Sequence, residues 1–434
     1  MNIQTVTVIG ATGTMGANVA GIFASFGNAK VFCVGRDIEK VRNTIPRIIA
    51  SVRADSIADN LVPADYTMLD KCVRESDLIF ESTSENIQVK KEIARLVSQS
   101  INEHAITCTG TSGLSIHEIS RCYPEEVRKR FFGVHMFNPP YSLSLCELIS
   151  TEATSETVKN ELREYLEKKL LRTVVEVKDS PAFLGNRIGF MFINEAMQYA
   201  EKYKDSGGID YIDAILGSFS GRSMPPLLTA DFVGLDVHKA IVDNIHNNTD
   251  DYANDSFTLP EFVQTLIDNG ALGRKKGEGL YKTFYYENGL KRKTVLDLNS
   301  EVYRDKIKYV FPFSERMKRH ISEGDYMLAF EALINNHSQE AEICLSFLLK
   351  FIIYAVYAAD KIGDGIDAAD DVMAAGFNWC PPLALYEALS QVADVRDLIR
   401  ERTELYSVVD VDRLLEKMVP SKYDFRKFFK TGRQ

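Results

Sequence analysis

The sequence VTVIGATGTMG at residues 6–16 joins a β-branched apolar run to a turn with glycines at positions 10, 13 and 16. The residues that follow, 17–26, have the apolar spacing of a helix. A strand that meets a helix through such a turn brings the backbone close to a pyrophosphate. The helix N–H groups and the positive end of the helix dipole then hold that anion. We therefore predict a nucleotide-binding turn made of Gly10, Thr12, Gly13, Thr14, Met15 and Gly16.

Short β-branched runs alternate with amphipathic helices over the first 177 residues. This alternation predicts a parallel sheet covered by helices on both faces. Beyond Lys178-Asp179-Ser180-Pro181, nearly every segment has helical spacing. The predicted fold is thus an α/β Rossmann-type domain followed by two all-α helical modules. The expected strands are Thr5–Ile9, Lys30–Val34, Leu78–Phe80, Ala105–Cys108, Phe131–Val134 and Thr173–Val177, with helices such as Met15–Phe26 and Ile87–Ser98.

An internal repeat divides the helical half. Gly208-Ile209-Asp210 with Asp213, then Pro225-Pro226-Leu227, recurs as Gly365-Ile366-Asp367 with Asp370, then Pro381-Pro382-Leu383. The glycines lie 157 positions apart and the proline pairs 156. We interpret this as two related helical modules joined by the polar stretch 286–300. The predicted domains are residues 1–178, 179–285 and 300–434, the last being a degenerate repeat of the second.

The composition is that of a globular protein, with 45% apolar and 26% charged residues in 434. The net charge of −10 argues against wholesale binding to nucleic acid or anionic lipid. The longest apolar run, 345–359, includes Lys350 and is shorter than a bilayer span, which indicates a buried helix. Seven scattered cysteines without a CxxC pair are typical of reduced thiols. With an apolar strand starting at Val6 and no room for a signal peptide, we expect a cytoplasmic protein without a metal site.

The end of the second expected strand bears on cofactor choice. An acidic residue usually stands there and binds the adenosine ribose, but this chain has Gly35-Arg36-Asp37. A guanidinium at Arg36 suits a 2′-phosphate, so Gly35 and Arg36 favour NADP over NAD. In the alternative interpretation, Arg36 is solvated and Asp37 caps the next helix. Both cofactors stay open.

The polar residues His135 and Glu147 are candidates for acid–base chemistry. His135 ends an expected parallel strand, which is where open α/β sheets bind ligands. Glu147 follows twelve positions later, after a proline turn, and a carboxylate beside an imidazole makes a competent general base. If the two do not meet, Glu147 is an ordinary surface glutamate.

These residues, taken in order with their neighbours, resemble the L-3-hydroxyacyl-CoA dehydrogenase family. The resemblance covers about residues 3–285. It includes Ser84-Glu85-Asn86-Ile87-Gln88-Val89-Lys90, Thr111-Ser112, His135-Met136-Phe137-Asn138-Pro139, Glu147, Asp179-Ser180-Pro181-Ala182-Phe183, Asn186-Arg187, Val233-Gly234-Leu235-Asp236 and Gly277-Glu278-Gly279-Leu280-Tyr281.

The resemblance implies a function and a role for each matched residue. A hydride moves between a nicotinamide cofactor and the C3 position of a 3-hydroxyacyl thioester, carried by coenzyme A or a carrier protein. His135 takes the hydroxyl proton, Glu147 orients His135, and Ser112 and Asn186 hydrogen-bond the substrate oxygen. Glu85 and Lys90 match positions on the cofactor side, although a plain helix-start role would explain them as well.

Several departures from the family pattern affect cofactor and acyl group more than the hydride chemistry. The loop Gly110-Thr111-Ser112-Gly113 keeps only one of two serines, Pro225 replaces a glycine, and the acidic ribose residue is missing. The second helical module has Ile343 where the repeat would place an asparagine, which indicates a copy without catalytic function. Because short family members dimerise through the first helical domain, we expect this copy to occupy the partner surface in a monomer. A homodimer is the alternative.

Two other functions compete with the first. The chain could be a dehydrogenase of a free β-hydroxy acid or another hydroxyl substrate, or a non-catalytic dinucleotide sensor. A sensor should have lost catalytic groups, whereas Ser112, His135, Glu147 and Asn186 are all present. Coenzyme A binding would need a basic patch, for which the sequence offers Arg42, Arg47 and Arg53. A solvated helix face explains these arginines equally well.

Overall fold

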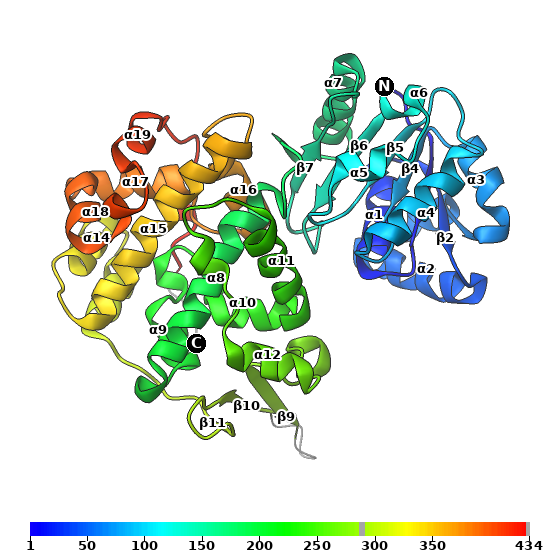
Figure 1. Cartoon of the computed structure of the whole chain (residues 1–434). Coiled ribbons are helices and arrows are strands. Elements are labelled where there is room, and N and C mark those ends of the chain that lie inside the picture. Colours follow the sequence, from blue (N-terminus) through cyan, green and yellow to red (C-terminus); the bar gives the residue numbers. More distant parts are fainter. Residues whose placement is uncertain (286–290, 431–434) are drawn as a thin grey trace. The chain divides into compact units, whose positions relative to one another are not determined.

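The computed structural model describes residues 1–285 and 291–430 (Figure 1). It divides into two compact units, which are taken separately. The sheet unit comprises Met1–Phe183 with Ile362–Asp364, and the helical unit comprises Leu184–Lys361 with Gly365–Gln434. The predicted division of the helical part into two domains stays a prediction.

An eight-stranded sheet forms the middle of the sheet unit, in the order β3-β2-β1-β4-β5-β6-β7-β8. Order 3-2-1-4-5-6 is that of a dinucleotide-binding Rossmann sheet, so the predicted fold class is confirmed. The inner strands β1, β2 and β4–β7 are almost wholly buried, because helices cover both faces. Their bounds are β1 Thr5–Ile9, β2 Lys30–Gly35, β3 Leu61–Asp65, β4 Leu78–Glu81, β5 Ile106–Thr109, β6 Phe131–Met136, β7 Leu145–Ile149 and β8 Thr173–Val177.

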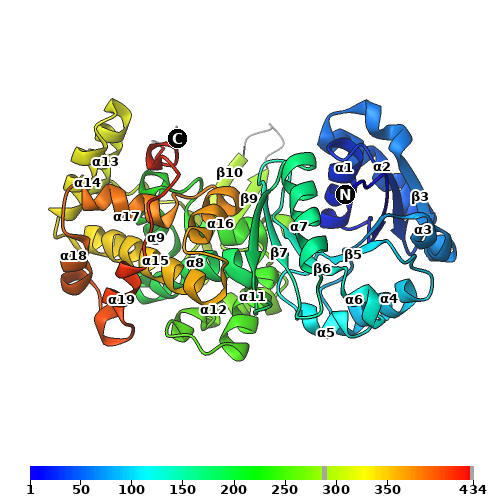
Figure 2. The ribbon, with the colours of Figure 1, turned by 90° about the horizontal axis from the view of Figure 1, so that it is seen from above.

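Figure 2 shows α1, α2 and α7 on one face of this sheet and α4, α5 and α6 on the other. Apolar side chains of α1, α2 and α7 share one buried cluster with β1, β2, β4 and β6. The helices of the unit are α1 Thr14–Ser25, α2 Ile38–Val52, α3 Leu69–Glu75, α4 Ile87–Ser98, α5 Ile116–Ser120, α6 Glu125–Arg128 and α7 Glu156–Glu164.

The sheet is parallel only as far as β6. Strand β7 runs antiparallel to β6 and parallel to β8, so the predicted parallel sheet contains one antiparallel pair. Strands β3 and β7 were not among the expected strands. The outer edge of β8 is met by a distant segment: Gly363 bridges Val177, and the Lys178 N–H donates to the Ile362 carbonyl at 2.8 Å.

The helical unit is built around two long helices, α8 Phe183–Lys202 and α15 Gln339–Ile362. Phe192 on α8 meets Phe347 and Phe351 on α15 edge-on. The other helices are α9 Ile209–Ile215, α10 Pro226–Val233, α11 Leu235–Asn248, α12 Glu261–Asp268, α13 Pro312–Glu323, α14 Tyr326–Ile334, α16 Ala368–Phe377, α17 Pro382–Ser390, α18 Val395–Arg402 and α19 Val411–Glu416.

The sequence repeat has a structural counterpart. Asp213 on α9 accepts the backbone N–H groups of Leu227 and Leu228 at the start of α10, at 2.8 and 3.0 Å. Asp370 on α16 accepts that of Leu383 at the start of α17, at 2.8 Å. Each copy therefore uses a buried aspartate to hold the first turn of the helix that begins with its proline pair.

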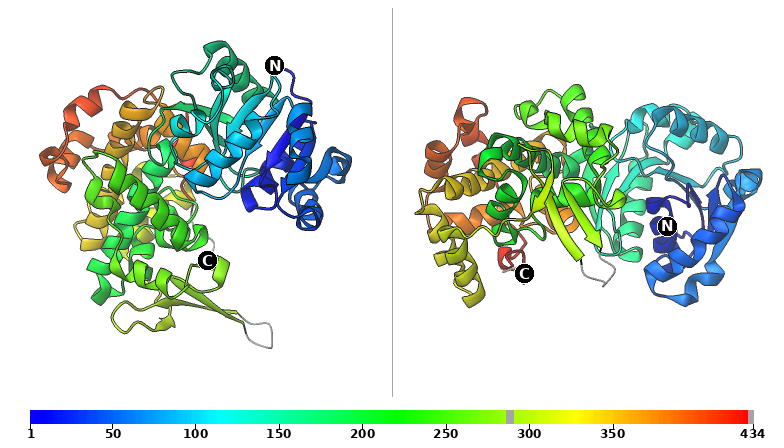
Figure 3. Two further views of the ribbon diagram at one scale, coloured as in Figure 1. Left: turned by 45° about the vertical axis from the view of Figure 1, so that its right-hand side comes forward. Right: turned by 90° about the horizontal axis from the view of Figure 1, so that it is seen from below.

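Three short strands interrupt the helical unit, whereas the sequence predicted all-α modules at 179–285 and 300–434 joined by a polar linker. They are β9 Tyr281–Tyr285, β10 Lys291–Leu296 and β11 Tyr303–Asp305, joined in the order β11-β10-β9 (Figure 3). Part of the predicted linker 286–300 thus forms β10, whereas residues 286–290 lie outside the described residues.

Helix α15 is long and apolar enough to cross a membrane, as the only such helix in the described part of the chain. Within the structure, 78% of its most apolar window is buried. This agrees with the predicted buried helix, since core helices of globular proteins have the same composition.

Candidate active site

His135 and Glu147 stand directly opposite each other on neighbouring strands. The antiparallel register of β6 and β7 pairs the two residues, and the imidazole Nδ1 lies 2.7 Å from a carboxylate oxygen of Glu147. Both are buried, with 5% and 0% of their surface exposed. The alternative of an isolated surface glutamate is therefore wrong.

A carboxylate at Nδ1 fixes the tautomer of a neutral imidazole. Nδ1 then carries the proton and donates a hydrogen bond to Glu147, while the lone pair of Nε2 stays available to accept a proton. The rings of Phe137 and Phe183 lie 4.6 and 5.6 Å from the imidazole, between ring centres. They limit the directions in which the imidazole can turn. This arrangement can accept a proton at Nε2 and return it.

The loop that carries Ser112 begins at the end of β5, the strand next to β6. One carboxylate oxygen of Glu85 accepts the Ser112 backbone N–H at 2.7 Å and the Thr111 hydroxyl at 2.5 Å. At the other end of the loop, Asp179 accepts the N–H groups of Ile116 and His117 at 3.0 and 2.8 Å. The predicted residue Ser112 thus lies in a loop held at both ends.

A buried ion pair lies below this loop, at the end of β4. The Lys90 ammonium contacts both carboxylate oxygens of Glu81, at 3.0 and 3.1 Å, and one of Glu85, at 3.6 Å. Burial alone would raise the pKa of Glu81, but Lys90 and the hydroxyl groups of Thr109 and Thr83 outweigh it, so the pKa is lowered. Glu81 was not among the predicted site residues. Asn86, not Glu85, caps α4.

The glycine turn between β1 and α1 packs too closely for side chains. A Cβ at Gly10 would lie 2.3 Å from the Ser82 carbonyl oxygen, and one at Gly16 would lie 2.3 Å from that of Gly10. Gly13 precedes α1 at its N-terminus, where no side chain among the described residues caps the helix. Its first N–H groups and dipole are therefore suited to an anion such as a dinucleotide pyrophosphate. These features fit the predicted cofactor role of Thr12, Thr14 and Met15 along the same turn.

At the end of β2, Gly35 is buried and Arg36 is exposed. A Cβ at Gly35 would lie 2.6 Å from a methyl group of Val41, so an acidic side chain does not fit there without movement. Asp37 caps α2 by accepting the N–H groups of Glu39 and Lys40, which confirms the alternative interpretation of that residue.

A cavity of about 760 Å³ lies between α1, the end of α2 and the loop after β6. Its lining residues are Asn18, Ser25, Phe26, Ser51, Val52, Arg53, Pro139, Tyr141 and Ser142. Of the three predicted basic residues, Arg53 lines this cavity, Arg42 pairs with Glu39 at 2.5 Å, and Arg47 is exposed.

Asn186 belongs to the helical unit, where it is buried in the first turn of α8 with 5% of its surface exposed. The structure thus brings together His135 and Glu147, and it places Ser112 in the loop after the neighbouring strand β5. The predicted role of Asn186 stays a prediction.

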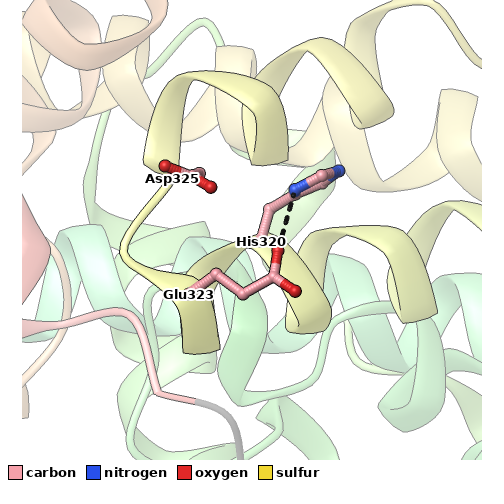
Figure 4. Close-up of side chains that lie close together, drawn as sticks. All are labelled: His320, Glu323 and Asp325. Carbon is pink, nitrogen blue, oxygen red and sulfur yellow. Dashed lines mark ion pairs between the residues drawn. The ribbon is translucent and has the colours of Figure 1, made fainter.

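One group in the described part of the chain has the spacing to hold a metal ion: His320, Glu323 and Asp325 at the end of α13 (Figure 4). His320 contacts Glu323 at 3.6 Å, and Glu323 also accepts from Arg319 at 3.0 Å. These are ordinary helix-end ion pairs, so we assign no ion to them.

Two protein-family models together match most of the chain. Residues 5–180 match the model of the 3-hydroxyacyl-CoA dehydrogenase NAD binding domain, and residues 183–283 match that of the 3-hydroxyacyl-CoA dehydrogenase C-terminal domain. The chain belongs to the 3-hydroxyacyl-CoA dehydrogenase family. It is thus an oxidoreductase of this type, with a domain that binds a nicotinamide cofactor. The resemblance of its motifs to this family is confirmed.

Relatives within the 3-hydroxyacyl-CoA dehydrogenase family include the human mitochondrial hydroxyacyl-coenzyme A dehydrogenase. It is 31% identical over 64% of this chain and 91% of the relative. A probable 3-hydroxyacyl-CoA dehydrogenase of Deinococcus radiodurans is 32% identical over 65% of this chain and 83% of its own. Another of Bacillus subtilis is 28% identical over 73% of this chain, which spans only 39% of that longer relative.

Two solved structures show how far the fold extends. The (S)-3-hydroxybutyryl-CoA dehydrogenase of Ralstonia eutropha is 27% identical, with a TM-score of 0.55 over 64% of this chain and 98% of that one. The 3-hydroxybutyryl-CoA dehydrogenase of Escherichia coli K12 is 22% identical, with a TM-score of 0.70 over 96% of this chain and 99% of that one. The second likeness concerns the fold alone and includes the second helical module.

Proposed function

We propose that this protein transfers a hydride between a nicotinamide cofactor and the C3 carbon of a 3-hydroxyacyl thioester, with His135 as general base. The observation that carries the proposal is the 2.7 Å contact between the buried His135 and Glu147. A surface pair would gain little from such a contact, whereas a buried imidazole held at Nδ1 is set to exchange a proton at Nε2.

In the oxidative direction, Nε2 of His135 accepts the C3 hydroxyl proton. The bound nicotinamide supplies the hydride acceptor. The imidazolium that results is stabilised by the Glu147 carboxylate at Nδ1, so the proton stays on Nε2 until it is released. In the reductive direction, the same Nε2–H returns the proton to the substrate oxygen.

Charge on the substrate oxygen needs hydrogen-bond donors. We assign this role to the Ser112 hydroxyl and the Asn186 carboxamide, as the family resemblance implies. Preorganised donors of this kind contribute a few kcal/mol to the stabilisation of a transition state, about 3 for a single one. The bracing of the Ser112 loop by Glu85 and Asp179 supports this role.

We propose coenzyme A rather than a carrier protein as the thioester carrier. The cavity beside the loop that follows His135 supports this choice, since its volume suits a small-molecule group. Arg53 on its wall would pair with a phosphate.

Replacing Arg53 with Met should raise KM for acetoacetyl-CoA by about tenfold. The same change should leave KM for acetoacetyl-pantetheine, which lacks the nucleotide, unaltered. An equal rise for both would assign Arg53 another role.

The preference for NADP that Gly35 and Arg36 suggested has no support in the comparisons, which name NAD. We therefore propose NAD as the cofactor. Steady-state assays with acetoacetyl-CoA and either NADH or NADPH test substrate and cofactor together, by the loss of reduced-nicotinamide absorbance. Turnover with NADH is the expected result. No turnover with either cofactor, with dinucleotide binding still measurable by calorimetry, would favour a free hydroxy acid substrate or a dinucleotide sensor.

A further inference from the structure

We propose that Glu85, Lys90 and Glu81 are positioning residues that fix the backbone at Ser112, so that its hydroxyl group meets the substrate oxygen. The inference rests on the proposed function for its catalytic consequence. It differs from the sequence-based prediction, in which Glu85 and Lys90 contact the cofactor. It also adds Glu81, which no sequence motif had indicated.

The contact that matters most is between Glu85 and the Ser112 loop. A single oxygen, Oε1, accepts the Ser112 N–H at 2.7 Å and the Thr111 hydroxyl at 2.5 Å. Thr111 Oγ1 in turn accepts the N–H of Leu114 at 3.0 Å. These bonds run along the loop itself, so the position of Glu85 determines the position of Ser112.

Lys90 holds Glu85 in place from below. Its ammonium group contacts Oε2 of Glu85 at 3.6 Å, while Oε1 accepts the two bonds from the loop. The Lys90 residue is only 1% exposed, whereas the Glu85 side chain is 45% exposed. An exposed glutamate alone would sample several rotamers, and a buried cation beneath it selects one.

The carboxylate of Glu81 neutralises the buried ammonium group of Lys90. It contacts Lys90 through both oxygens, and it also accepts the Thr109 hydroxyl at 2.6 Å and the Thr83 N–H at 2.6 Å. Thr109 ends β5 immediately before the loop. A buried ion pair is a weak source of stability, because desolvation offsets most of the attraction. This pair instead fixes the relative positions of the ends of β4 and β5, because Glu81 on β4 binds Thr109 on β5.

The loop needs this support because its sequence is permissive. Glycines at 110 and 113 flank Thr111 and Ser112, and glycine restricts the backbone less than any other residue. A catalytic donor must stay within about half an ångström of its place. The brace from Glu85 supplies that restraint on one side and Asp179 supplies it on the other.

Hydrogen–deuterium exchange of the Ser112 amide tests the brace without any assay of activity. We expect Glu85→Ala and Lys90→Met to speed exchange of this amide by about tenfold or more, since a charged hydrogen bond is lost or loosened. Lys91→Met is the matched control. Lys91 is the next residue on α4 and forms a more exposed ion pair with Glu118 at 2.7 Å. It should leave exchange at Ser112 unchanged.

Unchanged exchange in a folded Glu85→Ala variant would overturn the proposal, and this variant should fold because the Glu85 side chain is partly exposed. The result stands whether or not the protein turns over acetoacetyl-CoA. An inactive wild type would remove the proposed function, while amide exchange would still decide the brace.

A double-mutant cycle tests the catalytic consequence. Glu85→Ala should lower kcat by about tenfold with KM for the dinucleotide unchanged. The same change should have less than about a twofold effect in the Ser112→Ala background, because the residue it positions is gone. Equal losses in both backgrounds would contradict positioning through Ser112. A rise in dinucleotide KM with kcat unchanged would instead assign Glu85 to cofactor binding.

Discussion

At the scale of single residues, the bond between His135 and Glu147 is set by the sheet. The two residues are paired in the register of β6 and β7, so their separation is fixed by the backbone ladder. A general base held in this way needs no loop movement to reach its carboxylate. We therefore expect the pair to act as a unit.

Replacing His135 with Gln should lower kcat by about two orders of magnitude or more, because the proton acceptor is lost. Dinucleotide affinity, measured by calorimetry, should stay the same.

Glu147→Gln should also lower kcat, and it should lower kcat little further when it is combined with His135→Gln. The control is His104→Gln, a histidine whose side chain is 88% exposed. Unchanged turnover in His135→Gln would exclude His135 as the base.

The sequence pointed to this pair through residue type and spacing, but it did not point to Glu81. A glutamate that follows an apolar strand is common on protein surfaces, and nothing in its neighbours indicates burial. The expected strand also stopped one residue short, at Phe80. Only the fold shows that Lys90, nine positions later on α4, forms a buried ion pair with Glu81.

At the scale of elements, the repeated aspartates Asp213 and Asp370 make the helical unit sensitive to pH. Burial raises the pKa of Asp213 to about 6 and that of Asp370 to about 7, although backbone N–H groups and hydroxyls favour the charged form. The folded state therefore retains a proton between pH 4 and 7 that the unfolded state has already released. Stability from these groups is highest at low pH and falls as pH rises through that window.

Asp370→Asn should remove one such dependence. Between pH 4.5 and 7.5, the free energy of unfolding of the wild type should fall relative to the variant by on the order of 3–4 kcal/mol. Urea unfolding at both pH values measures the difference. Asp397→Asn, at an exposed position on α18, serves as control. If the wild type and Asp370→Asn differ in free energy of unfolding by the same amount at pH 4.5 and pH 7.5, Asp370 does not titrate in this range.

Elements with a clear apolar rhythm were predictable, including β1, β8 and α4, whose expected bounds agree with the structure. Strand β7 was missed because the charged Glu147 stands in the middle of its five buried residues, so the sequence lacks both a continuous apolar run and an alternation. Strand β3 contains Pro63, which argues against a strand in sequence and is tolerated at this edge of the sheet. Strands β9–β11 form a separate small sheet whose polar residues resemble a linker.

At the scale of the whole molecule, the two helical modules meet in a cluster of aromatic side chains that includes Phe192, Phe347 and Phe351. Trp379 follows α16, and its ring lies 5.4 Å from that of Phe192 on α8. The guanidinium group of Arg222 lies 3.6 Å from the Phe192 ring and 4.8 Å from the Trp379 ring. Burial of aromatic rings on this scale stabilises association strongly. It supports our proposal that the second module takes the place of a partner subunit.

The proposal predicts a monomer in solution. Light scattering during size-exclusion chromatography should give a mass near the chain mass of 48.9 kDa, independent of loading concentration. A mass of about twice that value at every concentration would show that the second module does not replace a partner.

The segment 362–364 makes the sheet unit discontinuous in sequence. It reaches β8 from a part of the chain nearly two hundred positions away and covers the end of a strand that has no other neighbour on that side within residues 1–285 and 291–430. A fragment cut after residue 183 would lose this cover, which pairs Val177 and Lys178, and would expose that border of β8 along its full length. Such borders recruit further strands, so the fragment should self-associate or precipitate where the intact chain does not.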